Sequence, residues 1–107
     1  MPYIKKELRN QLDMHIDALI DHTIAVTGAH GANNHTELQL PGVLNYITTR
    51  MIAGTYDRGV PLTYSEHNSI IGMLESCKDE WYRKRTGPYE DTKEIENGKV
   101  GWFSKAK

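Results

Sequence analysis

The chain has 107 residues, 38% of them hydrophobic, and a formal net charge of −1 at pH 7. That length suits a single domain with one small core and leaves too few residues for two. A charge so close to zero gives no general attraction to polyanions, so we predict neither a membrane partner nor a strong nucleic-acid signal. The charge is uneven, however, because residues 1–77 sum to −3 and residues 78–107 to +2. An anionic ligand would therefore favour the C-terminal part.

Cysteine content and hydropathy predict a cytoplasmic protein. Cys77 is the only cysteine, whereas small secreted domains usually carry several that form disulfides. The first ten residues lack the apolar segment of a signal peptide. No apolar run approaches the roughly 20 residues that span a bilayer. We therefore expect the protein in the cytosol.

Residues 5–26 are predicted to form a first amphipathic helix. Its apolar face recurs at the spacing of an α-helix and consists of Leu8, Leu12, Ile16, Leu19, Ile20 and Thr23. Gly28 is expected to end this helix. Residues 28–40 combine glycine, asparagine and histidine without periodicity, so we expect a flexible loop there.

A second helix is predicted from Pro41 to Tyr56, because proline suits the first turn of a helix. Arg50 is its only charged residue. One apolar face contains Val43, Leu44, Ile47 and Met51, and the opposite face contains Asn45, Thr49, Ile52 and Tyr56. We therefore expect this helix to be covered on two sides, within a bundle or at a subunit interface.

A third helix is predicted from the capping box at residues 63–66 to about Arg85. Its apolar stripe consists of Ile70, Leu74, Cys77 and Trp81. Gly87-Pro88 is expected to stop it. A short fourth helix, residues 90–96, should end at Asn97-Gly98.

The predicted fold class is all-α. We expect a small bundle of three main helices plus a short C-terminal helix, in a single domain over residues 1–107 with a tail at 99–107. The lean hydrophobic content and the two-sided second helix favour an oligomer, most simply a homo-oligomer.

The third helix also has a polar stripe opposite its apolar one. The stripe consists of Asn68, Gly72, Glu75, Asp79 and Tyr82. A mid-helix glycine costs about 1 kcal/mol relative to alanine, so Gly72 favours close approach by another helix or a planar ligand. The same pattern is equally typical of a solvated face with i,i+3 and i,i+4 charge pairs.

Arg50 and the basic, aromatic segment 82–89 are candidates for anion binding. An arginine on an apolar helix either pairs with a carboxylate such as Glu75 or holds an anion with its planar fork. Aromatic residues among arginines can stack on bases while the cations hold phosphates. Basic residues at a helix C-terminus also complement its dipole, without any ligand.

Catalytic motifs are missing from the sequence. No metal-ligand spacing, nucleophile motif or glycine-rich phosphate loop occurs, so we predict no catalytic residue, no metal and no cofactor. Glu75, Asp79 and Glu80 are too sparse for the magnesium centre of a helical pyrophosphohydrolase. A magnesium-dependent nucleotide-processing enzyme is therefore the least favoured function.

Four segments resemble a family of small, functionally unassigned proteins of tailed phages and prophages. They are MPYIK (1–5), GVLNYITTR (42–50), YSEHNSIIGMLESCKDEWYRKR (64–85) and PYEDTKEIENGKV (88–100). The resemblance implies a phage setting without a defined activity. Small phage proteins often inhibit host proteins stoichiometrically or act as sponges for immune signals, so the resemblance implies an anti-defence role in the host cytosol.

The leading hypothesis is a small homo-oligomer that sequesters a nucleotide-like anionic signal, such as a cyclic nucleotide. Cations would hold the phosphates, tyrosines would stack on a base, and amides and hydroxyls would supply neutral hydrogen bonds. The candidate ligand-binding residues are Asn45, Thr49, Arg50, Tyr64, Asn68, Glu75, Lys78, Tyr82, Arg83, Tyr89 and Lys93. The alternative is a stoichiometric inhibitor or interaction module of a host or phage protein, with Arg50 in a structural ion pair.

Overall fold

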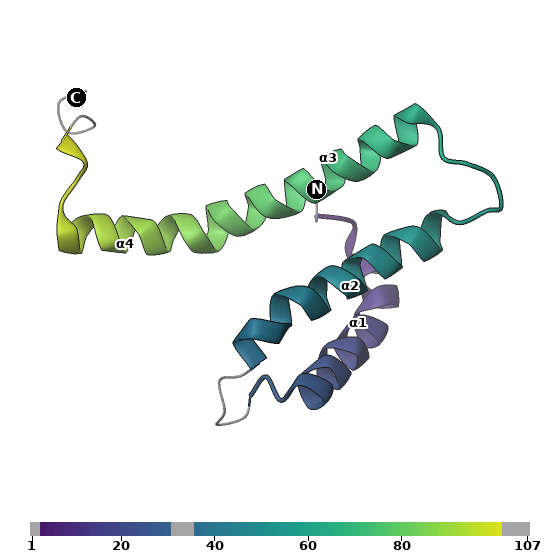
Figure 1. Ribbon diagram of the computed structural model, residues 1–107, viewed down its shortest axis with the longest axis horizontal. Coiled ribbons are helices and arrows are strands. Elements are labelled where there is room, and N and C mark those ends of the chain that lie inside the picture. Colours follow the sequence, from purple (N-terminus) through teal and green to yellow (C-terminus); the bar gives the residue numbers. More distant parts are fainter. Residues whose placement is uncertain (1–2, 31–35, 102–107) are drawn as a thin grey trace. The chain divides into compact units, whose positions relative to one another are not determined.

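The computed structural model describes residues 3–30 and 36–101, and these are helical apart from short connections (Figure 1). They contain no strand, which confirms the all-α prediction. The chain divides into two units, one at Tyr3–Thr63 and one that begins at Tyr64; each is described by itself. The single domain over residues 1–107 stays a prediction. None of the described helices is long and apolar enough to cross a membrane.

Helix α1 (Lys6–Thr27) forms where its apolar periodicity predicts it. Gly28 ends it in the left-handed region, with φ at 67°. Its N–H donates a hydrogen bond to the carbonyl oxygen of Ile24 at 2.8 Å. The glycine is needed there because a side chain strains this backbone conformation.

Helix α2 (Thr36–Tyr56) begins five residues before Pro41, so the prediction that this proline opens the helix is wrong. Pro41 lies in the second turn, where its missing N–H costs one hydrogen bond near the helix start. The predicted loop is likewise wrong over residues 36–40, which are helical. The rest of that loop, residues 31–35, lies outside the described residues, as do residues 102–107 of the predicted tail.

The second unit consists of one continuous helical segment, here called the rod. It comprises α3 (Tyr64–Trp81), a π-helical turn η1 (Tyr82–Thr86) and α4 (Gly87–Asn97). Its start matches the predicted capping box, and its end at Gly98 matches the predicted C-cap. The 34 residues of the rod extend for about 50 Å. The described residues therefore contain three main helices, and the short C-terminal helix predicted at residues 90–96 is α4, which starts earlier, at Gly87, and continues the last of them.

The π-turn explains why Gly87-Pro88 does not stop the rod. In a regular α-helix the proline ring would clash with the carbonyl group four residues earlier. In η1 the Gly87 N–H instead bonds to the Tyr82 carbonyl oxygen, five residues back, and the wider turn makes room for the ring. Gly87 keeps a helical φ of −58° although proline usually disfavours it in the preceding residue.

Alanine substitutions at Gly72 and Gly87, two glycines of the rod, should have opposite effects on the free energy of unfolding. Gly72→Ala is expected to raise the free energy of unfolding by up to about 1 kcal/mol, because nothing lies within 4 Å of the added Cβ. Gly87→Ala should lower it, because its Cβ would lie 3.1 Å from the Tyr82 carbonyl oxygen. Thermal unfolding followed by circular dichroism measures both. Destabilisation by Gly72→Ala would instead indicate a partner packed on the polar stripe.

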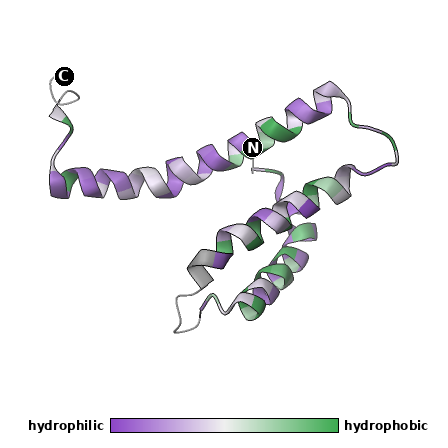
Figure 2. Cartoon of the chain, viewed as in Figure 1, coloured by the Kyte–Doolittle hydropathy of each residue, from purple (hydrophilic) through white to green (hydrophobic). Residues whose placement is uncertain are grey.

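None of residues 3–30 and 39–101 is buried. The predicted apolar residues of α1, Leu8 to Ile20, each remain 41–49% exposed, and Trp81 on α3 is 64% exposed. Figure 2 shows hydrophobic residues recurring along α1. A pair of helices or a single rod has too few neighbours to enclose a side chain. Both units therefore present apolar surface that a partner could cover.

Candidate functional site

Three predicted ligand-binding residues lie together on α2. Thr49 follows Asn45 by one turn, and its hydroxyl donates a hydrogen bond to the Asn45 Oδ1 at 3.2 Å. Arg50 is next to Thr49 in sequence, and all three side chains are exposed. The neutral groups are thus partly satisfied by each other, while the guanidinium of Arg50 forms no ion pair within the described residues.

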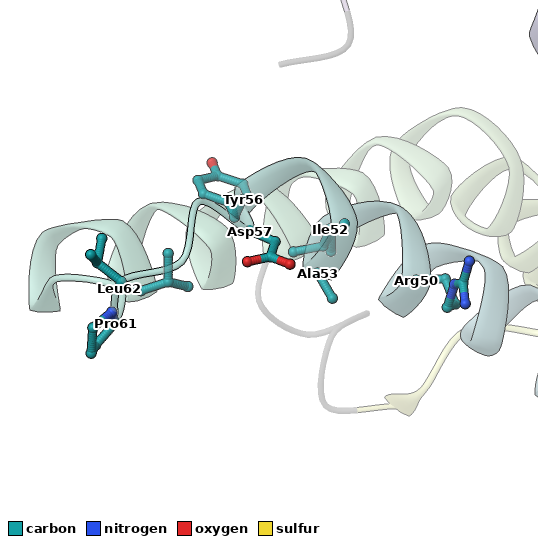
Figure 3. Close-up of a pocket in the computed structure, with 9 residues that line it drawn as sticks. Arg50, Ile52, Ala53, Tyr56, Asp57, Pro61 and Leu62 are labelled. Atoms are coloured by element: carbon teal, nitrogen blue, oxygen red, sulfur yellow. The ribbon is translucent and has the colours of Figure 1, made fainter.

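Arg50 lines an open pocket of about 610 Å³ at the C-terminal end of α2 (Figure 3). The other lining residues are Ile52, Ala53, Gly54, Tyr56, Asp57, Val60, Pro61 and Leu62. Figure 3 shows Arg50 apart from Asp57, whose Oδ1 accepts a hydrogen bond from the Gly59 N–H at 3.2 Å. The pocket combines one cation, Arg50, and one carboxylate, Asp57, with an aromatic ring and apolar walls, so an anionic ligand with an apolar part could bind only on the Arg50 side.

The other eight predicted residues are spread along the rod. From Tyr64 to Lys93 the helix rises about 44 Å at 1.5 Å per residue. One small ligand therefore cannot contact both ends of the set within one copy of the rod. All eight are exposed, including Tyr64 at 81%.

The predicted phosphate-binding cations of the rod already have carboxylate partners. Lys78 Nζ lies 2.6 Å from Glu75 Oε1 and 3.8 Å from Asp79 Oδ1. Hydrogen bonding by Glu75, then its charge and that of Asp79, raises the pKa of Lys78, so this lysine stays protonated and paired. Similar i,i+3 pairs join Arg83 to Glu80 at 2.6 Å and Lys93 to Glu96 at 3.2 Å. This arrangement favours the solvated-face interpretation of the polar stripe.

Tyr82 and Lys93 do come together, in an open pocket of about 530 Å³ on the rod. The other lining residues are Thr86, Glu90, Asp91, Glu94, Gly98 and Val100. Three carboxylates against one lysine make this pocket acidic. It therefore disfavours the phosphate group that Lys93 is predicted to hold.

Two features were missed by the sequence interpretation. Arg85 lies over the ring of Trp81 at 5.7 Å, and Lys93 lies over Tyr89 at 5.6 Å; their i,i+4 spacing could have predicted both contacts. The second feature is an apolar groove of about 290 Å³ between α1 and α2. It depends on how two helices pack, which no local pattern predicts.

Comparison with known proteins gives one match. No curated protein and no solved structure matches the chain. Among the described residues, no three histidine, cysteine, aspartate or glutamate side chains gather closely enough to hold a metal. Residues 1–100 match the family described as "Domain of unknown function (DUF6899)". Because the match spans nearly the whole sequence, the chain belongs to this family.

Proposed function

We propose that the protein is a homo-oligomeric interaction module whose rods pair along α3. The observation that carries the proposal is the apolar stripe of α3, here called the seam, which is Ile70, Leu74, Cys77 and Trp81. Its steps of four, three and four residues are the spacing of a coiled-coil seam. Leu74, Cys77 and Trp81 are exposed and Ile70 is half-buried, so a second rod could bury all four.

Burial of the seam supplies the driving force. Full burial of one leucine or isoleucine side chain stabilises by about 1.5–3 kcal/mol. A dimer would bury the exposed parts of four seam residues from each copy, and this burial opposes the entropy lost on association. Lys84 and Pro88 occupy the next seam positions, so the paired segment is short and ends at the π-turn.

The charges beside the seam favour parallel pairing. In a parallel coiled coil, the residue just before an a position faces the residue five positions later on the other helix. That rule would bring Glu80 of one copy near Arg85 of the other, at the π-turn where the regular helical register ends. Glu80 is also paired with Arg83 of its own chain, but such surface pairs contribute at most about 1 kcal/mol and can exchange partners. Parallel pairing in register also brings the two Cys77 residues together.

The proposal is tested by mass and by crosslinking. Light scattering across a concentration series should show a monomer that converts to a dimer. Mild oxidation should then join two chains through Cys77, the single cysteine, without loss of helicity. A monomeric mass at all concentrations and no disulfide-linked dimer would contradict the proposal. The phage-like segments suggest that the module works in the cytosol of an infected cell, where an anti-defence protein would act.

Sequestration of a nucleotide-like signal is a second candidate, favoured by Arg50 in its pocket. In one copy the other predicted cations are paired and spread along the rod, so a nucleotide site would combine residues of several copies. Calorimetric titration with cyclic dinucleotides, cyclic trinucleotides and cyclic ADP-ribose isomers tests this. Binding should disappear with Arg50→Ala, and no heat from any of these ligands with folded protein would exclude the function.

A further inference from the structure

The groove between α1 and α2 is almost wholly apolar. Its lining residues are Ile16, Leu19, Ile20, Thr23, Ile24, Ala29, Leu40, Leu44 and Ile47. The only polar side chain among them is Thr23, whose hydroxyl donates a hydrogen bond to the Leu19 carbonyl oxygen at 2.7 Å. The groove therefore offers apolar contact and no free hydrogen-bonding side chain.

A row of carboxylates accompanies the groove along α1. Asp13, Asp17 and Asp21 follow one another at four-residue steps. Each stands three residues before a groove-lining isoleucine, and residues so spaced are neighbours on the helix surface; the isoleucines are Ile16, Ile20 and Ile24. The three aspartates are exposed and form no ion pair within the described part of the chain.

The stretch of sequence that supplies the groove contains no lysine or arginine, and Arg9 and Arg50 flank it. A second α1–α2 pair would bring its own aspartates, and no cation from this stretch, toward the same row. Like charges repel, so self-pairing of these grooves is disfavoured.

We propose that this groove binds a basic amphipathic helix of a partner protein. Apolar side chains of that helix would fill the groove, as in other helix-in-groove complexes. Lysine or arginine stems would cross its rim and place their charged ends at the carboxylates. The aspartates are spaced by about 6 Å, one helical turn, which matches cations at i and i+4 of a docked helix. The inference extends the proposed function, because it concerns a different unit and a different partner from the α3 seam.

Two matched synthetic peptides test the proposal. Both are amphipathic helices of about 14 residues, four turns, with the same leucine face; one has lysines on its polar face and the other has glutamates. Fluorescence anisotropy with the full-length protein should give at least about tenfold tighter binding of the Leu/Lys peptide, a difference of 1.4 kcal/mol. Equal binding of the two peptides would overturn the proposal.

The triple variant Asp13→Asn, Asp17→Asn, Asp21→Asn should lose about tenfold or more in affinity for the Leu/Lys peptide. Its matched control removes the same number of charges from α4, through Glu90→Gln, Asp91→Asn and Glu94→Gln, and should bind as the parent does. An equal loss in the control would mean general attraction to an acidic protein, and would overturn the proposal. So would a rise in oligomer mass in the Asp variant, because it would show that the groove pairs with another copy. If the protein proves monomeric, which would contradict pairing along the α3 seam, these peptide results should be unchanged.

Discussion

Leu74→Asp is expected to convert the proposed dimer into a monomer. Leu74 lies at the centre of the seam, and both copies of a parallel dimer would place the new carboxylate there. Leu74 is 37% exposed in one copy, so each copy would lose roughly 0.5–1 kcal/mol of apolar burial at the interface, and desolvation of two unpaired charges side by side adds the larger cost. A total of about 3 kcal/mol corresponds to a dissociation constant raised at least 100-fold. Sedimentation equilibrium measures this constant directly.

Ile95→Asp is the matched control for Leu74→Asp. Ile95 lies on the same rod, in α4, and is 84% exposed. It stands outside the seam, so the same change of chemistry should leave the dissociation constant within about threefold of the parent value. If both variants dissociate equally, the contact does not run along α3. Circular dichroism would show that each rod keeps its helicity.

Helix ends with a local chemical cause could be predicted from the sequence. Gly28 and Gly98 both end helices with positive φ, which only a glycine adopts readily. Tyr64 begins α3 directly after Thr63, where the capping box places the first turn. In these cases the residues that decide the boundary are within a few positions of it, so a pattern in the sequence contains the whole cause.

The prolines show where local rules fail. The sequence predicts a helix boundary at Pro41 and another at Gly87-Pro88. Helix α2 nevertheless begins before Pro41, and the rod continues past Pro88. In α2 the cost is one hydrogen bond near the helix start, and in the rod the π-turn accommodates the ring. Neither outcome follows from the proline alone, because it depends on how the neighbouring turn adjusts.

The all-α fold is confirmed, whereas the ligand-binding residues stay a prediction. The sequence predicts that Lys78, Arg83 and Lys93 bind phosphate. In the structure each of these cations forms an ion pair with a carboxylate three residues away. The i,i+3 spacing contains that information, and it favours the solvated-face interpretation of the polar stripe. The α1–α2 groove could not be predicted from the sequence, because its lining residues, among them Ile16 and Ile47, come from two helices that must first pack together.

Ile47→Asp is expected to disrupt the α1–α2 pair while the rod persists. Ile47 is half-buried and lines the groove between the two helices. Helices in proteins gain most of their stability from packing an apolar face rather than from intrinsic propensity. Lost apolar contact and a partly desolvated carboxylate together should destabilise the pair by roughly 2–4 kcal/mol. Helices α1 and α2 have 22 and 21 residues against 34 in the rod, so the ellipticity at 222 nm should fall substantially without vanishing.

Met14→Asp separates this packing effect from the added charge. Met14 is on α1 and is 70% exposed, so the same net charge is introduced where no groove contact is lost. We expect an unfolding midpoint close to that of the parent protein, since exposed substitutions usually change stability by no more than about 0.5 kcal/mol. Equal unfolding of both variants would mean that α1 and α2 depend on charge balance and not on the groove. Unfolding of α1 and α2 in the Ile47→Asp variant alone would show that the apolar groove holds the two helices together. Docking of a basic helix against the row of Asp13, Asp17 and Asp21 requires this packing.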